Sequence, residues 1–273
     1  MLAEILHLCR NAPGALRLKR ELPQDELYAE LIARADRAGL AERRRALVAD
    51  LRGRVVEIGC GTGAMFPHYM EADVIGIEPD KAFAAKARAV ATPRIEVRDG
   101  IGEAIPIEDG AMDAAVLALV LCSVPDEEVI CREVARVVKP GGAVRLIEHV
   151  RSDHRVAGAL MRAVDPLWCW LNGQGCHLDR DPVPALERAG LQIESIKSFK
   201  SGARVCPRFR CVRSTRGGPV SGQFAHPASR RTSPQRRNWA GANLDVTSWR
   251  SVHNCRERDS TCCCMARMTA ALC

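Results

Sequence analysis

Apolar and polar positions follow two different periods over most of the chain. Seven short stretches have the continuous apolar content or the alternation typical of strands, the last being the weakest: 54–58, 74–77, 95–98, 113–120, 143–147, 191–196 and 208–212. Apolar residues at helical spacing occupy intervals between them, at 81–90, 126–138 and 182–189, and Asp126 is placed to cap the second of these helices. Strands that alternate with helices of this length predict a parallel sheet with right-handed crossovers.

Two helical stretches precede the first strand. Leu27, Leu31, Ile32 and Ala35 recur at helical spacing, and a second apolar and basic stretch covers 41–51. We therefore predict an α/β fold: a doubly wound, Rossmann-like, mostly parallel seven-stranded sheet that follows N-terminal helices.

The character of the chain changes after Arg213. Gly, Ser, Pro, Arg and Asn dominate the rest, and no apolar periodicity survives there. We predict an N-terminal helical segment at 1–50, the α/β domain at 51–213 and a basic, disordered extension at 214–273. Of the 40 Lys and Arg and 33 Asp and Glu, the extension holds nine Arg and three acids, which leaves 31 basic and 30 acidic side chains in 1–213. The α/β domain is thus nearly neutral, which argues against a specific nucleic-acid partner.

The thirteen cysteines indicate a reducing environment. Eight lie irregularly spaced in 1–213, mostly within apolar runs, as expected of reduced buried thiols in the cytosol. No apolar run approaches the roughly 20 residues that span a bilayer. The apolar start at 1–9 contains Glu4 and lacks the basic flank of a signal peptide. We therefore expect a cytoplasmic protein without a transmembrane segment.

The stretch with the most chemical information is Val55-Val56-Glu57-Ile58-Gly59-Cys60-Gly61-Thr62-Gly63-Ala64. It predicts a strand that enters a glycine-rich turn and then a helix, so that the backbone can approach a ligand closely. The spacing Gly59-x-Gly61-x-x-Ala64 satisfies the dinucleotide fingerprint. The same residues satisfy the Glu-x-Gly-x-Gly-x-Gly turn of S-adenosylmethionine (SAM) sites, so the glycines alone leave both ligands open.

Glu57 favours SAM over a dinucleotide. It lies two residues before the first glycine, at the carboxyl end of its strand, where doubly wound sheets bind ligands. A pyrophosphate there would meet a like charge, whereas SAM brings an ammonium and a sulfonium that a carboxylate attracts. Glu78 ends the next strand 21 residues later and suits a carboxylate that binds the ribose hydroxyls of either cofactor.

Three further segments follow the turn in order: 99–106 after the third strand, 113–124 with the fourth strand and its exit loop, and 136–142 before the fifth strand. With the glycine turn, they resemble the class I SAM-dependent methyltransferases, in the branch that acts on small molecules, over residues 45–213. A finer resemblance, to the methyltransferase-like family that includes alkyl-thiol S-methyltransferases, is carried by Glu148-His149-Val150, Asp165-Pro166-x-Trp168 and Gly175-Cys176-x-Leu178-x-Arg180.

The resemblance implies SAM as cofactor and a small-molecule methyl acceptor as partner. Glycine backbone would hold the methionine part of SAM, Glu57 would face its amino end, and Glu78 would hold the ribose. The adenine would lie near Gly102 and Glu103, and Leu119 would line the cleft beside the sulfonium. The implied cofactor-binding residues are Glu57, Gly59, Cys60, Gly61, Gly63, Glu78, Pro79, Gly102, Glu103 and Leu119.

Methyl transfer is an in-line displacement, which depends mainly on alignment of acceptor, methyl and sulfur in a dry pocket. An acceptor that must lose a proton also needs a base, and His149, just past the fifth strand, is the candidate catalytic residue. A structural histidine that bonds the loop is an equally good interpretation of it. By the resemblance, Asp165 and Trp168 belong to a segment that covers a hydrophobic substrate.

We expect no metal site. Cys176 and His177 are two adjacent ligands without a second pair, which makes a poor zinc site. In the extension, His253, Cys255 and Cys262–Cys264 lack paired Cys-x-x-Cys spacing, so metal binding there would be adventitious.

Three functions are compatible with these residues. The first is a SAM-dependent methyltransferase for a small hydrophobic acceptor such as a thiol, phenol or quinol. The second is a regulatory module that binds SAM without catalysis, and the third is an NAD-dependent oxidoreductase that uses the Ala64 fingerprint. The sequence predicts no particular acceptor atom or oligomeric state.

Overall fold

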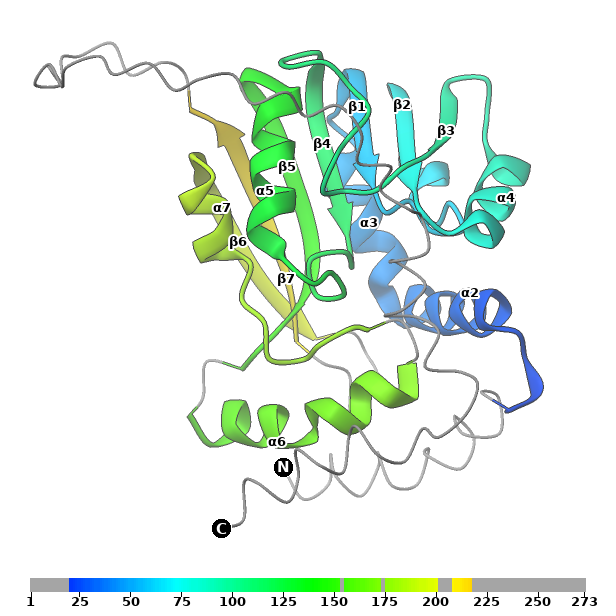
Figure 1. Cartoon of the computed structure of the whole chain (residues 1–273), viewed down its shortest axis with the longest axis vertical. Helices are drawn as coiled ribbons and strands as arrows, with labels where there is room; N and C mark the ends of the chain where they lie inside the picture. The colour runs from blue at the N-terminus through cyan, green and yellow to red at the C-terminus, as the bar shows by residue number, and fades with distance from the viewer. Residues whose placement is uncertain (1–19, 153–154, 173–174, 201–207, 218–273) are drawn as a thin grey trace, which may run out of the picture. The chain divides into compact units, whose positions relative to one another are not determined.

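The seven predicted strands form one sheet. The computed structural model describes residues 20–152, 155–172, 175–200 and 208–217, and the strand order within them is β3-β2-β1-β4-β5-β7-β6 (Figure 1). The strands are β1 (Arg52–Ile58), β2 (Glu71–Glu78), β3 (Ile95–Asp99), β4 (Met112–Ala118), β5 (Val138–Val150), β6 (Leu191–Lys200) and β7 (Arg208–Arg216). Strands β1 to β5 pair in parallel, and β7 pairs antiparallel with both β5 and β6. This arrangement confirms the doubly wound, mostly parallel sheet predicted from the apolar pattern.

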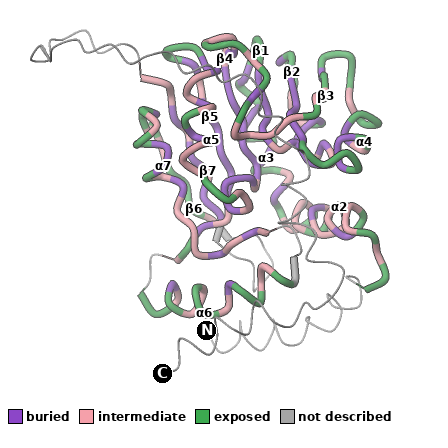
Figure 2. Tube along the Cα trace, viewed as in Figure 1, coloured by how far each residue is buried: buried purple, intermediate pink, exposed green. Residues whose placement is uncertain are grey.

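Helices cover both faces of the sheet. The helices are α2 (Gln24–Ala35), α3 (Ala41–Val48), α4 (Lys81–Val90), α5 (Glu127–Val137), α6 (Arg155–Asn172) and α7 (Val183–Arg188). Helices α3 and α4 pack on one face of the sheet, and α5 and α7 pack on the other. Successive strand residues point to opposite faces. Val55 therefore packs in one core with Leu47 of α3 and Ala87 of α4, while Val56 packs in a second core with Ile130 of α5. Buried positions concentrate along the central strands (Figure 2).

Helix α6 is set apart from these two layers. It lies across the end of the sheet at which the parallel strands finish (Figure 1). Gly158 and Asp165 are the buried residues among those described in this helix, while Val156, Leu167 and Trp170 are exposed. The helix therefore contributes little to the core and lies next to the loops that follow the parallel strands.

The last strand is longer than predicted. It continues through Arg216, and Ser214 is fully buried where β7 pairs with Val144 of β5 and Ile193 of β6. The predicted boundary between 213 and 214 is therefore three residues too early, because backbone pairing on both sides holds polar residues that apolar periodicity does not detect. The rest of the predicted extension, 218–273, and residues 1–19 of the N-terminal segment lie outside the described residues.

The glycine turn leads into a shorter element than the predicted helix. A single turn of 3-10 helix, Phe66–His68, follows it, and β2 begins at Glu71. The connection from Gly59 to Met70 is too short to hold the glycine turn and a helix of several turns before the parallel strand starts. The chain returns directly instead and places Tyr69 beside the end of β1.

Candidate cofactor and acceptor site

The turn after β1 is built from glycines in the left-handed region. Gly59 has φ +63° and Gly61 has φ +57°. A Cβ atom added at Gly59 would lie 2.8 Å from Cγ2 of Val120, in the loop after β4. The turn therefore packs directly against that loop, and a side chain at Gly59 would both strain the backbone and separate the two segments.

Glu78 joins the ends of β1 and β2. Its Oε2 atom accepts a hydrogen bond from the Gly61 N–H at 2.8 Å, and its Oε1 atom accepts one from the Asp80 N–H at 3.0 Å. Burial raises the pKa of this carboxyl above its ordinary value. Cys60 strengthens the same link, because its N–H donates to the carbonyl of Ile77 at 3.1 Å. Pro79 follows as an exposed residue.

Glu57 is buried at the carboxyl end of β1, with 1% of its surface exposed. Burial raises the pKa of its carboxyl to about 8, against the opposing effects of the Tyr69 hydroxyl and the Arg44 guanidinium. The Tyr69 O–H donates to Oε2 at 2.9 Å. A buried carboxylate repels a phosphate and attracts a cation, and a bound cation would in turn favour the ionised form of the carboxyl.

The two tyrosines of the chain both lie at this turn, and the sequence pattern did not single out either. Tyr69 bonds Glu57 from one side. Tyr28 comes from α2: a Cβ atom at Gly61 would lie 3.4 Å from its Cε1 atom, and its ring packs against Phe83 with centroids 5.1 Å apart. Helix α2 therefore covers the glycine turn. The apolar periodicity of this helix predicts that it packs against something but not that it packs against the turn.

The loop after β3 lies against the same edge. A Cβ atom at Gly102 would be 3.0 Å from Cγ2 of Ile58, the last residue of β1. Glu103 follows in this loop and is partly exposed. The predicted adenine-binding segment is thus close to the glycine turn, as a single cofactor would require.

The loop after β4 is strained and tightly held. Leu119 has φ +64° and is the non-glycine residue with a positive φ among the described ranges. Backbone strain of this kind persists only where the surroundings enforce it, and it concentrates at functional sites. Here the Leu119 N–H donates to the carbonyl of Ile147 in β5 at 2.8 Å.

Glu148 holds the rest of that loop, a role that its sequence motif does not indicate. Its fully buried carboxyl accepts from the N–H groups of Val120 at 2.9 Å, Leu121 at 3.0 Å and Cys122 at 3.3 Å. Burial raises its pKa to about 7, and these three N–H groups oppose the shift. The Arg180 guanidinium also holds this loop, because it donates to the Leu121 carbonyl at 2.8 Å.

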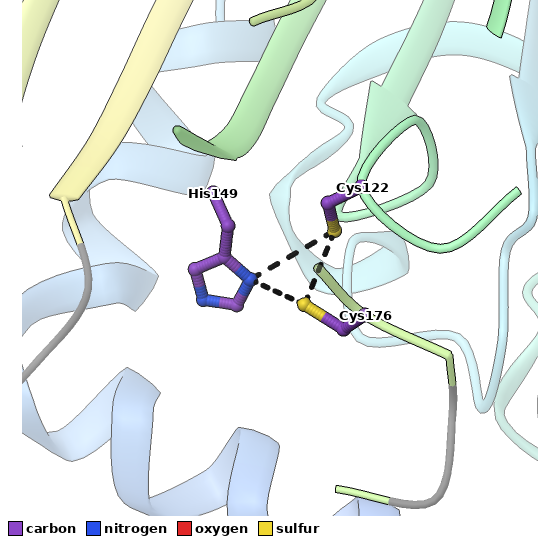
Figure 3. A group of neighbouring side chains, drawn as sticks. All are labelled: Cys122, His149 and Cys176. Atoms are coloured by element: carbon purple, nitrogen blue, oxygen red, sulfur yellow. Dashed lines mark hydrogen bonds between the residues drawn. The ribbon is translucent and has the colours of Figure 1, made fainter. Parts of the chain in front are cut away.

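His149 lies beside two cysteines (Figure 3). Its Nδ1 atom is 2.9 Å from Sγ of Cys176 and 3.8 Å from Sγ of Cys122, and the two sulfur atoms are 3.4 Å apart. Backbone bonding joins the two cysteine segments, because the His177 N–H donates to the Cys122 carbonyl at 2.7 Å. The structure thus places the predicted catalytic histidine beside two cysteines that are far from it in the sequence.

Asp165 and Trp168 of α6 adjoin this group. Asp165 accepts from the Leu178 N–H at 2.5 Å through Oδ1 and bonds His177 Nδ1 at 2.6 Å through Oδ2. Its carboxylate therefore positions the segment that carries Cys176. Trp168 meets the His149 ring edge-on, with centroids 6.3 Å apart, whereas Trp170 is 58% exposed.

These features together define a class of protein. A doubly wound sheet with a glycine turn after β1, a buried acid before that turn and a second acid at the end of β2 is typical of α/β enzymes that bind a nucleoside-containing cofactor. SAM fits the residues present, since the turn offers bare backbone and Glu57 offers a buried carboxyl to a cation.

Comparisons with known proteins agree with this class. The family described as methyltransferase domain matches residues 56–146. Thiol S-methyltransferase TMT1A of Homo sapiens is 35% identical over 188 residues, which cover 62% of this chain and 76% of that protein. Thiol S-methyltransferase TMT1B of Rattus norvegicus is 34% identical over 181 residues, which cover 60% and 72%. The crystal structure of a SAM-dependent methyltransferase from Mesorhizobium loti shares the fold, with a TM-score of 0.51 and 22% identity over 64% of this chain and 96% of that one.

The chain belongs to the class I SAM-dependent methyltransferases, and SAM is its methyl donor. This result confirms the SAM-dependent methyltransferase among the three predicted functions and sets aside the other two, while its acceptor stays a prediction. In the part of the chain that the structure describes, no helix combines the length and apolar character needed to cross a membrane.

Proposed function

We propose that the protein transfers the methyl group of SAM to the sulfur of a small hydrophobic thiol. The observation that carries this proposal is the 35% identity to a thiol S-methyltransferase over 188 residues. The Cys122, His149 and Cys176 cluster beside α6 supports it, because thiol chemistry needs a group that promotes loss of the thiol proton.

Under this proposal, the carboxyl ends of β1, β2 and β4 hold the cofactor. SAM supplies an electrophilic methyl group on a sulfonium, while the chain binds it, orients it and excludes water. The Glu57 carboxylate balances the ammonium, and Glu78 holds the ribose when its bonds to the glycine turn rearrange. The residues proposed to line the cofactor are Glu57, Gly59, Cys60, Gly61, Gly63, Glu78, Pro79, Gly102, Glu103 and Leu119.

The acceptor must become a thiolate before its sulfur attacks. An alkyl thiol is a weaker acid than a cysteine side chain, whose pKa is about 8.5 and which is only a few per cent ionised near pH 7, so even less of the acceptor is a thiolate there. We expect His149 to promote this loss, from its position beside the loop after β4. The new carbon–sulfur bond then forms as the methyl–sulfonium bond breaks, which yields a methyl thioether and S-adenosylhomocysteine.

The acceptor is expected between α6 and the loop after β4. Trp168 and Leu119 offer apolar surface there, and both are only partly buried. Asp165 is a positioning residue for this site, because its carboxylate holds His177 and Leu178 in place. A hydrophobic thiol suits this lining better than a charged acceptor does.

Acceptors that share one carbon skeleton test the proposal. Purified protein is incubated with SAM and phenylethanethiol, phenylethanol or phenylethylamine, and the products are identified by mass spectrometry. We expect methylation of the thiol alone. Preferred methylation of the alcohol or the amine would refute the thiol assignment. Gly61→Arg provides the inactive control, since it forces a long side chain into a left-handed backbone facing Tyr28.

A further inference from the structure

Two thiols and an imidazole from distant parts of the chain meet in one place. Cys122 follows β4, His149 lies near the end of β5, and Cys176 lies in the segment after α6. The two Sγ atoms are 3.4 Å apart, and Nδ1 of His149 is 2.9 Å from Sγ of Cys176 and 3.8 Å from Sγ of Cys122 (Figure 3). Both cysteines are buried, and the histidine is partly buried. Thiolates and imidazoles are the ligands that zinc prefers.

The separations suit one tetrahedral ion. Bonds of about 2.3 Å to sulfur and about 2.0 Å to nitrogen require roughly 3.8 Å between two sulfur ligands and roughly 3.5 Å between sulfur and nitrogen. The observed distances of 3.4 Å, 2.9 Å and 3.8 Å differ from these by less than 1 Å. Small side-chain rotations would therefore admit an ion without movement of the backbone.

The surroundings hold each of the three ligands in place. Glu148 accepts from the Cys122 N–H, and the His177 N–H bonds the Cys122 carbonyl. Phe209 packs against the His149 ring with centroids 4.5 Å apart. Outer contacts of this kind orient metal ligands and pre-organise a site.

Asp165 supplies the support for the third ligand. Its two carboxylate oxygens bond His177 and Leu178, the residues directly after Cys176. Asp165, His177 and Asp179 also lie close enough together to be considered as ligands. Because both oxygens of Asp165 already hold the chain, we assign this second group to positioning.

The two sulfur atoms are not joined to each other. A disulfide needs a sulfur–sulfur distance of about 2.05 Å, and the 3.4 Å found here shows that Cys122 and Cys176 are thiols, the form that a metal can bind. Cys60 and Cys131 are equally buried, but they lie in the apolar cores, and neither has a histidine nitrogen within bonding distance among the side chains that the structure describes. The cluster therefore has a donor set that the other described buried cysteines lack.

We propose that Cys122, His149 and Cys176 bind one zinc ion and that its remaining coordination position takes the acceptor thiol as thiolate. The second half of this proposal rests on the proposed function. Coordination to zinc removes the thiol proton, which passes to solvent, and leaves a sulfur nucleophile. His149 then promotes proton loss as a metal ligand. The site has no recognisable metal-binding motif in the sequence, since each ligand lies 27 residues from the next.

The position of the cluster suits transfer from SAM. Val120 packs against Gly59 of the cofactor turn, and Cys122 lies two residues further along the same loop. Glu148 binds both ends of this short stretch through the N–H groups of Val120 and Cys122. A thiolate held at the cluster is therefore tied rigidly to the turn that binds the methyl donor.

The test uses the full chain with the cysteines of the extension replaced by serine, so that adventitious binding there does not contribute. The replaced residues are Cys255, Cys262, Cys263, Cys264 and Cys273. The protein is purified with a phosphine reductant, its zinc content is measured by mass spectrometry, and zinc is exchanged for cobalt. We expect one metal ion per chain, with the visible bands of tetrahedral cobalt and thiolate-to-cobalt charge transfer.

Single variants identify the ligands. Cys122→Ser, Cys176→Ser and His149→Gln should each weaken cobalt binding by more than about 100-fold, since even the loss of an outer partner costs about 10- to 100-fold. Cys211→Ser, at a partly buried cysteine on β7, should leave it unchanged. SAM affinity serves as the folding control for every variant. A folded protein that binds no cobalt, or a cobalt spectrum that survives in the Cys122→Ser and Cys176→Ser double variant, would overturn the site.

The open position is tested with mercaptoethanol and S-adenosylhomocysteine. We expect the thiol to add a charge-transfer band to the cobalt form, and ethylene glycol to leave the spectrum unchanged. No change with the thiol would overturn the assignment of this position. Failure of the two proposals can be told apart: methylation of phenylethanethiol by metal-free protein refutes the role of zinc in thiol activation alone, and cobalt binding without thiol methylation refutes the thiol function alone.

Discussion

The proposed contact between Glu57 and the ammonium of SAM requires that Glu57 change its protonation state when SAM binds. Burial raises the pKa of its carboxyl to about 8, although Tyr69 donates a hydrogen bond to it. Near pH 7 the free protein therefore carries Glu57 mostly in the neutral form, whereas an ammonium beside it favours the carboxylate. Binding of SAM below pH 8 should release a proton.

The pKa sets the size of this effect. At pH 6.5 a carboxyl with a pKa of about 8 is about 97% protonated, so binding should release close to one proton per SAM. Ionising the carboxyl at that pH costs about 2 kcal/mol, since each pKa unit corresponds to about 1.4 kcal/mol. SAM affinity should thus rise by up to about tenfold per pH unit between pH 6 and pH 7.5, before the amino group of SAM itself loses its proton.

Titration calorimetry at pH 6.5, in two buffers with different ionisation enthalpies, counts the protons released. Glu57→Gln should abolish the release and make affinity independent of pH over this range, with a loss of about 10- to 100-fold near pH 7.5. Tyr69→Phe keeps the carboxyl and should keep the release. A wild-type binding enthalpy that is the same in both buffers, with a flat affinity profile, would refute the reasoning.

The free energy of unfolding of the free protein should also depend on the protonation of Glu57. The pKa of Glu57 in the fold lies above its ordinary value of 4.5, so its stabilising contribution is complete below that pH and is lost as the pH rises through about 8. Glu57→Gln should therefore raise the melting temperature relative to wild type more at pH 8.5 than at pH 6. An equal difference at both pH values would contradict a buried, neutral Glu57.

Three other changes test separate parts of the molecule. Gly59→Ala should lower the free energy of unfolding by more than about 1 kcal/mol in urea titrations, because the backbone has φ +63° and the new Cβ would lie 2.8 Å from Val120; an unchanged midpoint would contradict this. Asp165→Asn should lower kcat/KM for the thiol at least about tenfold with the Kd for SAM unchanged, and equal losses in both would argue for general unfolding. Truncation after Gly217 should leave the melting temperature unchanged, while truncation after Arg213 removes paired residues of β7 and should lower it by at least about 2 °C.

The sequence alone determined the architecture and the cofactor. Strands and helices are local, and their periods of apolar residues appear directly in the chain: the segment predicted as a helix at 81–90 is α4, and Asp126 caps α5 as expected, accepting from the N–H groups of Glu128 and Val129. The glycine turn is also contiguous, so its motif could be compared with those of known families. At the end of β7 the backbone pairs without an apolar pattern, so the strand predicted from apolar periodicity ended too early.

Only the tertiary structure decided which residues share the site. Crossovers bring together the ends of strands that are far apart in sequence. They place Tyr28 over the glycine turn, three N–H groups around the Glu148 carboxylate, and Cys176 against His149. No periodic pattern in the sequence reveals these contacts. They join residues that are far apart along the chain and close in space, so neighbouring residues carry no signal of them.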